Sequence, residues 1–209
     1  MRIVSLLFAC LLWNMTFGQK AVSKEISTLL TEGKPLQEVS LIHFVSNEVT
    51  NRSIPLEGLT KGTIVSIDEV AIEKLLNGNS DFIQLGLPLS ERQNLKLNLV
   101  RHEIFAEDFA LYTSSEPGIP FNYTPGVHYK GVVEGDPSSL VAVSVFNNEV
   151  MALISTGHGN MILGRIDNDR ESRHILYAEN DLDKTSGFDC STPDDGFGYT
   201  EEDLKPQAA

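Results

Sequence analysis

Apolar and polar positions alternate along much of the chain after residue 82. Leucine recurs at every second position in two stretches, first at Leu85, Leu87 and Leu89 and then at Leu95, Leu97 and Leu99. A period of two is typical of a strand with one buried face. Shorter apolar runs of the same kind are found at 41–45, 127–133, 140–146, 150–154, 161–166 and 174–177. The pattern therefore predicts a series of short strands.

A helical pattern is clearest in residues 69–76, whose apolar positions fall mostly on one side. Asp68 is a suitable N-cap for this helix, and Asn77 and Gly78 are expected to end it. Residues 19–35 contain a shorter apolar pattern that ends in Gly33, Lys34 and Pro35. They predict either a short helix or a loose lead-in segment.

Turn residues separate the predicted strands by only a few positions, at 135–137, 147–148 and 157–160. Such short connections favour antiparallel pairing, because a parallel crossover needs a dozen or more residues. We therefore predict a mostly-β fold, an antiparallel sandwich or meander with one short helix. Residues 36–178 form the body of this single domain.

The first eighteen residues have the pattern of a secretory signal peptide. Arg2 supplies the positive charge, residues 3–13 are apolar apart from Ser5, and Gly18 and Gln19 flank the expected cleavage point. The alternative is a lipoprotein leader ending at Cys10. The apolar run is shorter than the roughly 20 residues that span a bilayer. We expect an exported protein, secreted to the cell exterior, with no transmembrane segment.

Acidic residues outnumber basic ones by 29 to 16, which gives a formal net charge of -13. This balance argues against nucleic-acid binding, which requires a basic surface. Much of the excess lies in residues 179–209, where nine acidic residues accompany only two lysines. This acidic tail is expected to be flexible when isolated.

Motifs for catalysis are weak. His102 and Glu103 begin like the helical zinc motif, but position 106 is Ala where a second His is required, so we interpret them as exposed strand residues. The sequence has no Gly-x-Ser-x-Gly elbow and no glycine-rich phosphate loop. Asp167, Asp169 and Glu171 fit an acidic turn better than a calcium loop. We do not expect this chain to be an enzyme by itself.

Cys190 becomes the lone cysteine once the signal peptide and Cys10 are removed. A secreted chain with one cysteine cannot form an internal disulfide. The thiol is then either a metal ligand, an exposed group without function, or half of an intermolecular disulfide. Its position in the acidic tail is unusual for a buried structural cysteine.

The segment 128–144, HYKGVVEGDPSSLVAVS, resembles the prodomain of reprolysin-like zinc metalloproteases of the disintegrin-and-metalloprotease type. The similarity extends over residues 95–154 and weakens at 173–177. Glycines near a strand end and Asp-Pro in a turn act mainly through the fold, so we interpret the motif residues as structural. The positions that carry the resemblance are His128, Tyr129, Gly131, Glu134, Gly135, Ser139 and Ser144.

The resemblance implies that the chain is a propeptide that keeps a secreted zinc metalloendopeptidase latent as a zymogen. In such a cysteine switch, the Cys190 thiolate binds the zinc of a partner catalytic domain, in cis or in trans, and the β-rich body masks the cleft. Ser191 follows this cysteine where the family often has glycine. No cofactor is expected on this chain alone.

The sequence ends 19 residues after Cys190 (209 - 190 = 19), so we expect either a fragment of a longer precursor, which we favour, or a free-standing prodomain-like protein. A secreted β-sandwich binding or adhesion module with no protease partner is the alternative function.

Overall fold

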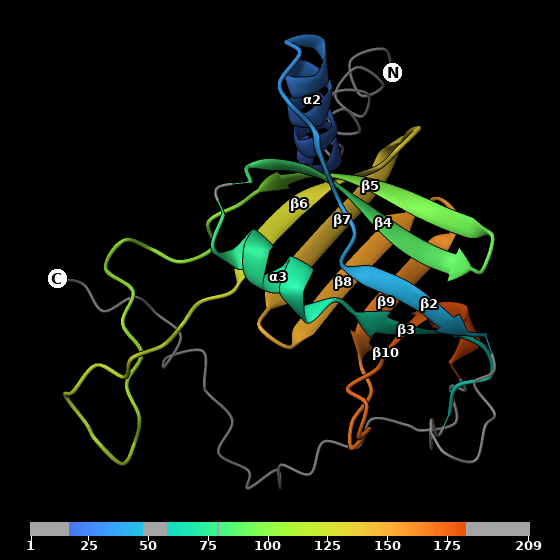
Figure 1. The fold of residues 1–209 in the computed structure, drawn as a ribbon. Coiled ribbons are helices and arrows are strands. Elements are labelled where there is room, and N and C mark those ends of the chain that lie inside the picture. Colours follow the sequence, from blue (N-terminus) through green and yellow to red (C-terminus); the bar gives the residue numbers. More distant parts are fainter. Residues whose placement is uncertain (1–16, 48–57, 79, 183–209) are drawn as a thin grey trace, which may run out of the picture.

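The computed structural model describes residues 17–47, 58–78 and 80–182, and in these ranges ten strands form one sheet (Figure 1). Two α-helices accompany the sheet, α2 (Phe17–Thr31) and α3 (Glu69–Leu76). The strands are β1 (Gln37–Val39), β2 (Ile42–Ser46), β3 (Thr63–Ile67), β4 (Phe82–Ser90), β5 (Gln93–Arg101), β6 (Val127–Val133), β7 (Asp136–Phe146), β8 (Glu149–Thr156), β9 (Gly159–Arg165) and β10 (His174–Ala178). A short 3-10 helix, η1 (Glu179–Asp181), follows β10.

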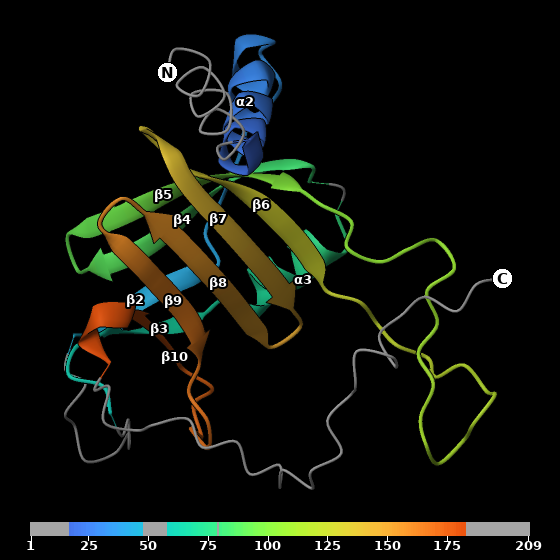
Figure 2. The ribbon, with the colours of Figure 1, turned by 180° about the vertical axis from the view of Figure 1, so that it is seen from behind.

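The sheet curls until its two edges meet. The strand order is β1-β4-β5-β6-β7-β8-β9-β10-β3-β2, which places β1 and β2 at opposite edges. Only Ser40 and Leu41 separate these two strands in the chain, and the three residue steps from Val39 to Ile42 span at most about 11 Å. A hydrogen bond of 2.8 Å from the Thr63 hydroxyl in β3 to the Leu89 carbonyl in β4 connects the strands next to the two edges. The curvature is visible from both sides (Figures 1 and 2).

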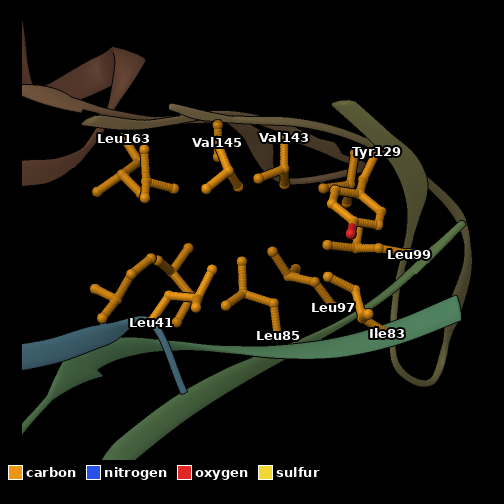
Figure 3. Close-up of a cluster of buried hydrophobic side chains, with 14 of the residues drawn as sticks. Leu41, Ile83, Leu85, Leu97, Leu99, Tyr129, Val143, Val145 and Leu163 are labelled. Atoms are coloured by element: carbon orange, nitrogen blue, oxygen red, sulfur yellow. The ribbon is translucent and has the colours of Figure 1, made fainter. Parts of the chain in front are cut away.

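The main core fills the inside of the curled sheet. Apolar side chains from one wall face those of the opposite wall, so a single sheet provides both layers (Figure 3). Leu85, Leu97 and Leu99 are fully buried here, as their alternation predicted. Tyr129 lies in the same cluster.

Helix α3 lies at one end of the curled sheet and adds Ile72 and Leu75 to the main core (Figure 1). Its bounds agree with the sequence prediction. The Asp68 side chain accepts a hydrogen bond of 2.9 Å from the Ala71 backbone N–H, which caps the first turn. Asn77 is the C-cap.

Helix α2 packs on the convex side of the sheet and shows that the lead-in is an integral part of the fold. Ile26 is buried against Phe82 and Val132. Lys130 of β6 forms an ion pair of 3.1 Å with Glu25. The expectation of one short helix was therefore incomplete. Residues 19–35 were predicted to be either a short helix or a loose lead-in, and they contain most of α2, the longer of the two α-helices in the described ranges.

The mostly-β prediction is confirmed, with local differences. Eight of the ten strands pair only antiparallel, whereas β1 pairs parallel with β4. The turn expected at 135–137 is centred one residue earlier, on Glu134 and Gly135. His102 and Glu103 are exposed as predicted, although β5 ends just before them, at Arg101. Within the described ranges, no helix is long and apolar enough to cross a bilayer.

Candidate functional site

The residues that carry the family resemblance converge on the hairpin of β6 and β7. Gly131 lies where β6 passes closest to β5. A Cβ atom at this position would overlap the carbonyl oxygen of Asn98 and would lie 2.9 Å from the Cα of Leu99. Only glycine therefore fits this strand pairing.

The turn of the hairpin is held by Ser139. Gly135 has a φ of +81°, a conformation that glycine adopts without strain. The Ser139 hydroxyl accepts a hydrogen bond of 2.8 Å from the Val133 N–H and donates one of 2.6 Å to the Asp136 carbonyl. Ser139 is fully buried, so its hydroxyl replaces ladder bonds that the bulge next to Val133 removes.

Replacing Ser139 by alanine is expected to lower the free energy of unfolding by about 1–3 kcal/mol, because the buried Val133 N–H then has no acceptor. Urea unfolding followed by circular dichroism measures the change. The neighbouring Ser138→Ala variant is the matched control, since Ser138 is exposed and water can replace its bonds to Asp136. Equal losses in the two variants would contradict this role of Ser139.

Glu134 belongs to a polar cluster on the outer side of the sheet. Its carboxylate accepts a hydrogen bond of 3.0 Å from the Gln84 side chain. The same Gln84 nitrogen donates to the Asn98 side chain at 2.9 Å. Gln84 and Asn98 are buried in β4 and β5, so Glu134 satisfies a polar group that would otherwise be costly to bury.

Tyr129 anchors the hairpin to the loop before β4. Its ring is in the core, and its hydroxyl donates a hydrogen bond of 3.0 Å to the Ser80 carbonyl. Burial raises the pKa of Tyr129 to about 12. The phenol therefore stays protonated at neutral pH and serves as a structural donor.

His128 and Ser144 form a hydrogen-bonded pair across β6 and β7. The His128 Nδ1 and the Ser144 Oγ are 2.9 Å apart. The imidazole lies edge-on to Phe105 and Phe146, with ring centroids 5.9 and 5.8 Å away. Its Nε2 is buried, with no hydrogen-bond partner among the described residues, and burial lowers the pKa of His128. No acid orients the ring in this part of the structure, as a serine catalytic triad would require.

All seven motif residues lie in the β6–β7 hairpin, and their contacts reach β5, β4 and the loop before β4. These contacts maintain the sheet, and they bring together no nucleophile, base and oxyanion donor. The motif is therefore informative about the fold.

The candidate zinc ligand, Cys190, lies outside the described residues. The chain before it is fixed at η1, where the Thr60 N–H and hydroxyl each donate a hydrogen bond of 2.9 Å to the Asp181 carbonyl. Leu182, the last described residue, bridges to Leu59. The expected cleavage point of the signal peptide, between Gly18 and Gln19, lies in the first turn of α2.

The acidic turn between β9 and β10 is occupied by an internal ion pair. Arg173 donates to both carboxylate oxygens of Asp169, at 3.0 and 2.6 Å, and it also lies 3.4 Å from Glu171. Hydrogen bonds from Arg173 hold the pKa of Asp169 below its usual value. Among the described residues, no three His, Cys, Asp or Glu side chains are grouped to hold a metal ion.

His174 is a buried polar residue whose burial the sequence did not predict. It is fully buried at the start of β10. Its Nε2 accepts a hydrogen bond of 3.2 Å from the Val150 N–H, and its Nδ1 lies 3.1 Å from the Ser172 carbonyl. The first bond requires an unprotonated Nε2, and the second requires a proton on Nδ1. The ring is therefore neutral, and burial lowers the pKa of His174.

Lowering the pH from 7.5 to 5.5 is expected to reduce stability through His174. The unfolded chain takes up a proton near the ordinary histidine pKa of about 6.5, whereas the folded chain resists it. The stabilisation is complete above that pH and is lost as the pH falls below it. Urea unfolding at both pH values should show a smaller pH effect in His174→Gln than in the wild type. Since His128 is present in both proteins, only the difference reports on His174, and equal pH effects would contradict the assignment.

Comparison with known proteins adds no family assignment. No protein-family model matches this sequence, and no curated protein matches it significantly.

Proposed function

We propose that this chain is the prodomain of a secreted zinc metalloendopeptidase and keeps that enzyme latent. The proposal rests on the 128–144 block, whose resemblance to reprolysin-like prodomains is carried by residues of one hairpin. Gly131, Gly135 and Ser139 each meet a steric or hydrogen-bonding requirement of that hairpin, so the block corresponds to a definite piece of structure.

Cys190 is the proposed ligand for the zinc of the partner catalytic domain. A thiolate in the open coordination position excludes the water that would attack a substrate. The tether raises the local thiol concentration to roughly millimolar, so one weak ligand is sufficient. Cys190 is eight positions after Leu182 (190 - 182 = 8), and eight residue steps span at most roughly 29 Å between Cα atoms. If Cys190 is the ligand, the zinc lies within roughly that distance of Leu182, extended by the cysteine side chain and a Zn–S bond of about 2.3 Å.

Loss of the thiol is expected to weaken inhibition by at least about tenfold if one zinc ligand contributes 1.4 kcal/mol or more. The test adds residues 19–209, and separately the Cys190→Ala variant, to a reprolysin-like catalytic domain and follows peptide cleavage. Weaker inhibition by the variant supports the zinc switch. Equal inhibition by the two proteins would overturn the role of Cys190. Masking of the cleft by the β-rich body would then be the explanation of the inhibition. A well-folded sample that does not inhibit the cognate domain would overturn the prodomain proposal.

A secreted binding module is the second candidate function. The observation in its favour is the long connection between β5 and β6, which exposes several aromatic side chains away from the sheet. Such a module would bind its partner with the protease absent.

A further inference from the structure

The connection between β5 and β6, residues 102–126, projects away from the curled sheet in both views and is called the aromatic loop below (Figures 1 and 2). Among the described residues, fourteen large apolar side chains are exposed, and seven of them belong to this loop. Clustered exposed apolar groups mark interaction sites in soluble proteins. The seven are Ile104, Phe109, Leu111, Tyr112, Ile119, Phe121 and Tyr123.

Contacts within the aromatic loop join its two arms and pack three of its aromatic rings together. The Phe121 N–H donates a hydrogen bond of 2.7 Å to the Leu111 carbonyl, which joins the two arms of the loop. At its base, the Phe105 ring lies 4.5 Å from that of Phe109 and 6.1 Å from that of Tyr123. The arms enclose a shallow groove of about 330 Å³. A preformed groove reduces the entropy lost when a partner binds.

The charge of the loop is of one sign. Residues 102–126 contain Glu103, Glu107, Asp108 and Glu116, and they contain no lysine or arginine. Glu103 pairs with Arg101 at 3.0 Å, whereas the other three form no ion pair within the described ranges. Glu107 and Asp108 are exposed and stand in the sequence between Phe105 and Phe109, two residues that line the groove. The rim therefore favours a cationic partner.

The same charges disfavour three other occupants. A second copy of the chain would bring an acidic loop against a molecule of net charge -13. The chain's own segment 183–209 has more acidic than basic residues and would be repelled as well. A membrane surface with anionic lipids attracts basic segments rather than acidic ones.

We propose that the aromatic loop is a docking surface for a protein segment that carries an apolar side chain next to lysine or arginine. The apolar side chain fills the groove between Phe109 and Phe121, and the cation lies against Glu107 and Asp108. This surface goes beyond the proposed function, because it applies to a prodomain and to a binding module alike.

The test selects a phage library of random 12-residue peptides on the immobilised chain and measures the affinity of the most enriched peptide by fluorescence anisotropy. Enriched sequences are expected to combine aromatic or aliphatic residues with lysine or arginine. Phe109→Ser/Phe121→Ser should weaken binding by at least about tenfold, in the manner of buried anchor residues. Glu107→Gln/Asp108→Asn should weaken it severalfold and reduce its dependence on salt.

Matched controls are available on other surfaces. Phe109 and Phe121 are 48% and 55% exposed, and Met151 and Leu153 on β8 are 48% and 49% exposed. Met151→Ser/Leu153→Ser therefore removes a comparable amount of exposed apolar surface. Glu69→Gln/Glu73→Gln removes two exposed charges from α3. Both controls should bind the peptide as the wild type does, and thermal melts should show that all four variants fold.

Several outcomes would overturn the proposal. The proposal is wrong if the selection yields no enriched peptides or yields peptides without basic residues. It is also wrong if the enriched peptides bind the wild type and Phe109→Ser/Phe121→Ser with equal affinity. Binding of the wild type, but not of that variant, to phosphatidylcholine vesicles would assign the loop to a membrane surface. Concentration-dependent dimerisation that the same variant abolishes would assign it to a second copy of the chain.

Discussion

Replacing Gly131 by alanine is expected to destabilise the protein by about 3 kcal/mol, at the upper end of overpacking effects. The added Cβ overlaps the Asn98 carbonyl and approaches the Leu99 Cα, and both are backbone atoms of β5. Backbone cannot rotate away as a flexible side chain can, so β5 and β6 have to separate. Urea unfolding measures the loss, and hydrogen exchange should show the weakened pairing in these two strands.

Gly86→Ala is the matched control for this variant. Gly86 also lies within a long strand, β4, but a Cβ atom built on it has no neighbour within 4 Å. The change is expected to be neutral within about 0.5 kcal/mol, or slightly stabilising, because alanine restricts the unfolded chain. A comparable loss in both variants would mean that strand glycines are costly to replace in general and would remove the special role of Gly131.

Leu97→Ala is expected to lower the free energy of unfolding by about 2–5 kcal/mol, the range for truncation of a fully buried leucine. Leu97 is 0% exposed in β5 and faces the opposite wall of the curled sheet (Figure 3). Since one sheet provides both walls, a cavity there removes contacts from both sides of the core. Chemical unfolding monitored by circular dichroism gives the value.

Leu153→Ala makes the same chemical change on the convex side of β8, where Leu153 is 49% exposed. We expect a change within about 0.5 kcal/mol, typical of surface positions. If the two leucine variants lost the same stability, the assignment of the concave side as the main core would be wrong.

The candidate site was only partly predictable. The 128–144 block was recognised from residue identities, but its contacts were not, because they involve distant partners such as Ser80, Gln84 and Asn98. The strand at 174–177 was predicted, but the burial of His174 was not, since histidine is intermediate between the typically buried and typically exposed residue types. The aromatic loop was overlooked because its apolar residues follow neither a strand period nor a helix period. The zinc-switch role of Cys190 stays a prediction.

Local patterns by themselves determined most of the elements of this protein, although they predicted neither β1 nor β3 and left α2 open. Alternating leucines predicted β4 and β5, and the Asp68 cap with Asn77 and Gly78 predicted the bounds of α3, because both signals depend on residues adjacent in the chain. Only the tertiary structure decided how these elements combine. The closure of the sheet, the parallel pairing of β1 with β4 and the packing of α2 on the convex side all join residues far apart in sequence. Their free energy comes from apolar surface that is buried only when both partners are present, and no local window contains both.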